Sequence, residues 1–142
     1  IQALLFELGF EANLDITAYD AFAQRVNETT YNLAEMNWAS SDPNLVLFNM
    51  FHSSQAGAGG QFNRTRVQSE ALDSLIEGAR SALTPEIRED ILAEVQEYAM
   101  ENALILPLWD SDWVLMSAPE VRGQAFDPEG RPLFHNFWIV NE

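Results

Sequence analysis

The chain has 142 residues, of which 22 are acidic and seven basic, and its formal net charge is −15 at pH 7. This charge argues against a nucleic-acid partner, because phosphate binding needs clustered Lys and Arg. The absence of cysteine excludes disulfide scaffolds, thiolate zinc sites and cysteine nucleophiles. The 47% hydrophobic content suffices for one core of ordinary size, and no apolar run approaches the ~20 residues of a spanning helix.

The first part of the chain predicts helices that alternate with strands. Apolar spacing and period-two alternation predict a helix over 1–8, a strand over 10–16, a helix over 18–26, a strand over 31–38 and a helix over about 44–51. Gly9 ends the first helix, and Pro43 stands near the start of the third. Because the chain opens inside a helical pattern, we expect it to be a piece of a longer protein.

The second part begins with a Ser-, Gly- and Gln-rich loop and continues with two long helices. The pattern predicts the loop over 53–65, a helix over about 69–82, a second helix that begins at Thr84, and strands over 104–109 and 113–118. Thr84 caps the second helix, which carries its apolar residues on one stripe and Glu or Asp elsewhere. We interpret the acidic residues of 67–103 as a solvated helix face.

The tail carries Phe134, Phe137, Trp138, Ile139 and Val140. A segment this apolar needs cover, either from this domain or from a second lobe. Helices and strands that alternate with short connections predict an α/β fold.

Short motifs in this order support a more specific interpretation. They are the helix that ends in Gly9, the helix over 88–98, and the short sequence motifs at 31–33, 37–43, 72–75, 106–109 and 121–123. Together they resemble the C-terminal part of a family 5 extracellular solute-binding protein, the peptide- and nickel-binding class of ABC importer receptors. No one of these motifs is specific, but their order covers nearly all of the chain.

The resemblance implies a periplasmic-binding-protein-like lobe, a mixed sheet flanked by helices, truncated from a two-lobed parent. Residues 1–121 would form the ligand-binding lobe, and 122–142 a return segment that packs on the other lobe. The parent would capture a peptide or similar solute by lobe closure, without catalysis or cofactor. Its partners would be that ligand and ABC permease subunits, on the periplasmic or extracellular face of the membrane.

Two segments are candidates for ligand contact. Trp38 follows a predicted strand, where open α/β sheets tend to place ligands, and Asn37, Ser40 and Ser41 accompany it. The alternative for Trp38 is a place in the core. In peptide-binding relatives an Asp soon after this Trp meets the ligand's amino group, but Asp42 here is better explained as a helix cap, which suggests a neutral ligand or a shifted contact.

The second candidate segment is formed by Trp109, Asp110 and Ser111, which follow the strand predicted over 104–109. The alternative is a solvated turn. Asp110 and Asp112 also leave open a hydrolase with paired carboxylates, although nothing else in the sequence supports one. A third possibility is an interaction domain that docks through its apolar tail. His52 and His135 belong to no metal-binding motif, so we predict no metal site.

Overall fold

In the computed structural model, which describes residues 1–28, 30–57 and 62–140, the chain divides into two units, Ile1–Glu35 and Met36–Glu142. Residues 58–61 of the predicted loop lie outside the described residues. Within the described ranges, none of the helices combines the length and apolarity needed to span a membrane.

The first unit contains two helices, and both were predicted. Helix α1 covers Gln2–Glu7. The chain leaves the helix at Gly9, whose φ of +87° lies in the left-handed region. The backbone N–H of Phe10 then donates to the carbonyl of Leu5 at 2.9 Å, which satisfies one of the last helical carbonyls. Helix α2 (Tyr19–Glu28) follows, two residues longer at its end than the pattern predicts.

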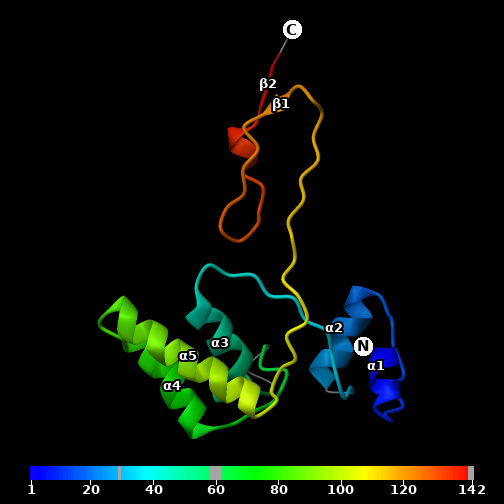
Figure 1. Cartoon of the computed structure of the whole chain (residues 1–142), viewed down its shortest axis with the longest axis vertical. Helices are drawn as coiled ribbons and strands as arrows, with labels where there is room; N and C mark the ends of the chain where they lie inside the picture. The colour runs from blue at the N-terminus through cyan, green and yellow to red at the C-terminus, as the bar shows by residue number, and fades with distance from the viewer. Residues whose placement is uncertain (29, 58–61, 141–142) are drawn as a thin grey trace. The chain divides into compact units, whose positions relative to one another are not determined.

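The second unit is built on α3 (Pro43–Phe51), α4 (Glu70–Ser81) and α5 (Pro85–Glu101), which lie side by side in Figure 1. Each begins at a side-chain cap. The caps are Asp42, Ser69 and Thr84, which accept from the backbone N–H groups of Asn44, Leu72 and Ile87. These caps satisfy donors that a helix start leaves without partners, so the helices begin where the sequence predicts.

The core lies where these three helices meet. Phe51, Leu72, Ile76, Val95 and Ala99 are at most 1% exposed and form one cluster. On α4 and α5 these residues are spaced four apart, which places them on the inner face. The stripe predicted for α5 included Ile87, but Ile87 is 48% exposed, because the contact with the other helices is made further along α5.

Two asparagines are buried within this unit. The side-chain amide of Asn44 donates to the carbonyl of Ile76 at 3.1 Å and so joins the start of α3 to α4. The amide of Asn63 donates to the carbonyls of Phe51, His52 and Val67. A buried amide is costly unless it is bonded, so both residues define the path of the chain around the helices.

A small antiparallel sheet forms near the end of the chain. Strand β1 (Val121–Arg122) pairs with β2 (Trp138–Ile139), with Val121 opposite Ile139. A short 3₁₀ helix, η2 (Phe134–Asn136), precedes β2, and another, η1 (Ser53–Gln55), follows α3. In the tail, Phe134, Trp138 and Ile139 are 58% to 67% exposed, so this unit does not cover them.

The four predicted strands over 10–16, 31–38, 104–109 and 113–118 are wrong for this structure, because none of them is a strand. A strand exists only where a neighbour pairs with its backbone groups, and among the described residues the one sheet is β1 with β2. These segments have the alternating or apolar sequence pattern of strands, but among the described residues no neighbouring strand pairs with them.

Candidate functional site

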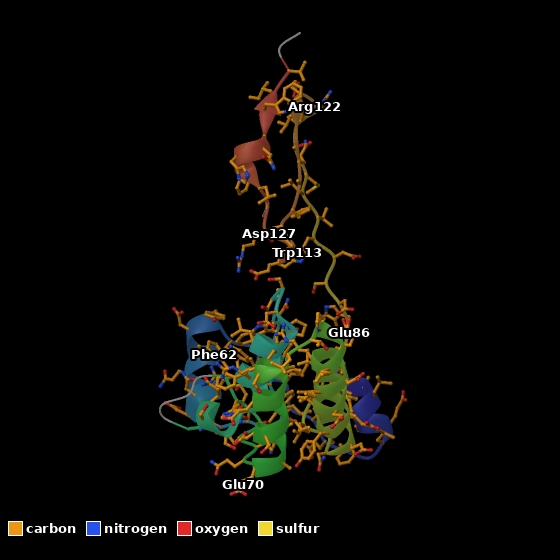
Figure 2. The ribbon with its side chains drawn as sticks, turned by 90° about the vertical axis from the view of Figure 1, so that its left-hand side faces the viewer. Phe62, Glu70, Glu86, Trp113, Arg122 and Asp127 are labelled. Atoms are coloured by element: carbon orange, nitrogen blue, oxygen red, sulfur yellow. The ribbon has the colours of Figure 1, made fainter. Side chains whose placement is uncertain are left out.

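Trp38 is half-buried and packs edge-on against the ring of Phe62, with 4.8 Å between ring centroids and 88° between ring planes. It is not among the fully buried residues of the helical core. Phe62 itself is 37% exposed and is labelled in Figure 2. An edge-to-face pair is a favourable aromatic geometry, and it holds the indole at the surface of the unit.

The residues around Trp38 are held by polar contacts. Asn37 is exposed. The hydroxyl of Ser40 accepts from the backbone N–H of Asp42 at 3.2 Å. The backbone N–H and the hydroxyl of Ser41 both donate to Oε1 of Glu129, at 3.5 Å and 3.3 Å.

Asp42 is a helix cap, as the sequence predicts. Its Oδ1 accepts from the N–H of Asn44 at 3.1 Å and also receives Arg88 Nη2 at 2.5 Å. Oδ1 of this carboxylate is thus committed to the start of α3 and to a guanidinium on α5. The segment 37–41 is therefore followed by a residue, Asp42, that is held by both α3 and α5.

The second predicted segment is open to solvent. Trp109 is 66% exposed, and Asp110 and Ser111 are exposed on an extended backbone. Within the described part of the chain, no hydrogen bond, ring contact or groove joins them to the segment around Trp38. The structure thus fixes Trp38, Ser40 and Ser41 but does not bring the two candidate segments together.

Trp113, which the sequence places in the same aromatic and carboxylate cluster as Trp109 and Asp110, is fixed more firmly than Trp109. Its indole lies over Gly130: a Cβ built on that glycine would come within 2.1 Å of the indole Nε1. Figure 2 shows Trp113 and Asp127 near one another at this end of the hairpin. The contact joins the extended segment to the turn at 127–130.

Two surface grooves are present in the described residues, and neither contains a predicted site residue. One, of about 400 Å³, lies at the start of α5, and its lining consists of Pro43, Ala82, Leu83, Thr84, Pro85, Arg88, Glu89 and Leu92. The other, of about 510 Å³, lies in the first unit and is lined by residues of 2–13. Both are open hollows on the surface.

His52 is buried at the end of α3 and has protein partners on both ring nitrogens. Nδ1 accepts from the backbone N–H of Ser54 at 3.1 Å, and Nε2 lies 3.3 Å from Oε1 of Glu77. Asp73 Oδ1 is 4.0 Å from Nδ1 and accepts from the N–H of Ser53. Across the described ranges, no three His, Asp or Glu side chains converge as metal ligands would.

Comparison with known proteins finds a similar curated protein and similar solved structures, whereas no protein-family model matches the chain. The probable D,D-dipeptide-binding periplasmic protein DdpA of Escherichia coli is 25% identical over 136 residues, which are 94% of this chain and 26% of DdpA. The structure of HbpA2 from Haemophilus parasuis matches 99% of this chain and 27% of that chain, with a TM-score of 0.70 and 23% identity. The chain thus spans about a quarter of the length of both relatives.

The comparisons confirm two sequence predictions. The likeness to HbpA2 confirms the predicted fold class, a periplasmic-binding-protein-like lobe. The similarity to DdpA confirms the resemblance to solute-binding proteins. The site residues and the division at 121 stay predictions.

Sequence reasoning missed Phe62 and Glu129 as neighbours of the Trp38 segment. Phe62 follows a Gly-rich stretch that carries no periodic signal. Glu129 lies 88 positions from Ser41, in an Asp-Pro-Glu-Gly turn that is readable as a turn but not as a neighbour of Ser41.

Proposed function

We propose that this chain is part of a solute-binding receptor of an ABC importer, and that it supplies one wall of the site that captures a peptide or similar small solute. The observation that carries this proposal is the similarity to DdpA, a probable D,D-dipeptide-binding periplasmic protein, along 94% of the chain. The fold shared with HbpA2 also supports it.

In the proposed mechanism the ligand is bound by closure rather than transformed. Contacts from two lobes stabilise the closed form, so the ligand shifts the equilibrium toward it, and the closed form docks to the permease. Asn37, Trp38, Ser40 and Ser41 would contribute one set of contacts, and Trp109, Asp110 and Ser111 another. The segment around Trp38 suits this role because its indole is held at the surface by Phe62 rather than buried in the core.

The proposed location is the periplasmic or extracellular face of the membrane, where a receptor of this class would meet both its ligand and its permease. DdpA is named as a periplasmic protein, which supports this location. We propose further that 1–121 forms most of one lobe and that 122–142 returns to the other, with the turn at 127–130 keeping its contacts to Ser41 and Trp113 of the first lobe. The exposed Phe134, Trp138 and Ile139 of the tail support this division, because they lack cover in this unit.

The test is Trp38→Ala in the full-length protein, with D-alanyl-D-alanine as the probe and titration calorimetry as the measurement. We expect about a tenfold loss of affinity, since an aromatic wall residue contributes on the order of 1–3 kcal/mol to binding. The melting temperature should change by no more than a few degrees. A collapse of thermal stability together with affinity would instead place Trp38 in the core.

The matched control is Trp138→Ala, which removes an exposed indole from the tail. It should leave the affinity for the dipeptide within about twofold of the wild type if the tail packs on the other lobe away from ligand. The same titration, followed by NMR of the dipeptide, tests catalysis. Hydrolysis of the peptide bond that disappears in Asp110→Asn would contradict a pure binding function.

A further inference from the structure

The turn at 127–130 holds the backbone of Glu129 and so sets the direction of its side chain. The backbone N–H of Gly130 donates to the carbonyl of Asp127 at 3.0 Å, which closes the turn. Asp127 Oδ1 accepts from the N–H groups of Glu129 and Arg131, both at 2.8 Å. Asp, Pro and Gly occupy the positions they favour in a β-turn, so the turn forms from local sequence alone.

Contacts from outside the turn hold it further. Gly130 is buried, has φ of +78° and lies beneath the Trp113 indole. The turn closes a short hairpin, in which Phe126 and Pro132 form an isolated antiparallel bridge. The backbone that carries Glu129 is therefore fixed on both sides, and its side chain leaves from a rigid base.

The carboxylate of Glu129 is only 22% exposed and has two partners. Oε2 pairs with Arg131 Nη2 at 2.5 Å. Oε1 accepts from the backbone N–H and the hydroxyl of Ser41. The arginine fixes one oxygen within the hairpin and leaves the other for Ser41, so the carboxylate acts as a bridge between distant parts of the sequence.

The segment that receives this bridge has no regular structure of its own. Residues 37–41 lie in neither helix nor strand. The segment is held at one end by Trp38 against Phe62 and at the other by Asp42, the cap of α3. Ser41 lies between these points, and Glu129 is the acceptor for its backbone N–H.

We infer that Glu129 is a positioning residue for the Trp38 segment. By fixing the backbone at Ser41, its carboxylate sets the direction in which Trp38 faces a ligand, without touching that ligand. The expected effect of Glu129 on ligand binding rests on the proposed function. The position of the indole itself is independent of any ligand.

The experiment uses the full-length protein labelled with 5-fluorotryptophan and observed by ¹⁹F NMR, with the Trp38 resonance assigned by Trp38→Phe. Glu129→Ala should shift or broaden the Trp38 resonance and leave that of Trp138 unchanged. Glu129→Gln should shift the Trp38 resonance less than Glu129→Ala does, because it keeps one acceptor oxygen of the two. The control is Glu120→Ala, which removes an exposed carboxylate of the same region and should change neither resonance.

Titration with D-alanyl-D-alanine adds the functional measurement. Glu129→Ala should weaken binding about tenfold and Glu129→Gln by less than about threefold, since a hydrogen bond to a charged acceptor is among the stronger ones.

The outcomes separate the two proposals. An unchanged Trp38 resonance in Glu129→Ala overturns the positioning role, whatever binds. A shifted Trp38 resonance in a protein that does not bind the dipeptide supports the positioning role and counts against the dipeptide as ligand. A general loss of thermal stability in Glu129→Ala, with the resonances of Trp109, Trp113 and Trp138 also affected, would make the residue a structural one and overturn the inference.

Discussion

The helices α3–α5 and the extended segment over 104–118 are both rich in apolar residues, yet they behave differently. Leu72, Ile76 and Val95 of the helices are fully buried, whereas Leu106 and Met116 of the segment are 67% and 89% exposed. A helix satisfies its backbone groups internally, so its apolar face is free to pack on any suitable neighbour. A strand needs a neighbouring backbone as well as an apolar face. We therefore propose that strands outside the described residues pair with this segment.

The largest expected effect is a difference in the loss of stability between variants of the helical core and variants of the extended segment. Ile76→Ala in this chain should lower the free energy of unfolding by about 2–5 kcal/mol, because it leaves a cavity among the helices. Leu106→Ala should change it by less than about 0.5 kcal/mol, because the side chain is exposed. Urea unfolding followed by circular dichroism measures both. Equal losses would show that the segment is packed in solution.

The same pair of variants sharpens the comparison in the full-length protein. There we expect neighbouring strands to cover the segment, so Leu106→Ala should cost about 2–3 kcal/mol. An unchanged small effect would contradict the proposed sheet.

A smaller effect is expected at Gly130, which anchors the extended segment through Trp113. Gly130→Ala should cost about 2–4 kcal/mol, from the left-handed backbone together with displacement of the indole. Gly9→Ala is the matched control: its φ of +87° is similar, but nothing lies within 4 Å of the added carbon. The control should therefore cost only about 1 kcal/mol. Thermal unfolding compares the two, and equal costs would mean that Trp113 does not rest on the turn.

The smallest effect concerns the start of α5. The pKa of Glu86 lies below its ordinary value, because its carboxylate accepts from its own backbone N–H and from the Thr84 hydroxyl. Since the pKa is lowered in the folded state, the stabilisation is present above the ordinary carboxyl pKa and is lost as pH falls through the folded one. Glu86→Gln should lower the melting temperature slightly at pH 7 and not at about pH 2. Glu94→Gln is the matched control, because it removes a carboxylate of α5 away from the start of the helix.

The sequence predicts the helices well because their signals are local. Caps at Ser69 and Thr84 and spacing along α4 and α5 depend only on neighbouring residues. The strands could not be placed, because pairing depends on residues far away or outside the described ranges. The candidate site stays a prediction. The strand at whose end Trp38 was expected is absent, and the contact of Ser41 with Glu129 joins positions 88 apart, which no local pattern reveals.

Asn63 has a consequence for any modification of this chain. With Arg64 and Thr65 it forms an Asn-X-Thr acceptor for N-linked sugars. Its amide is nevertheless buried and donates to three carbonyls, so a transferase could reach it only before the loop closes. A glycan attached to the unfolded chain during secretion from a eukaryotic host would occupy the amide nitrogen that otherwise donates to these carbonyls. In the folded chain this nitrogen is buried and would not be glycosylated.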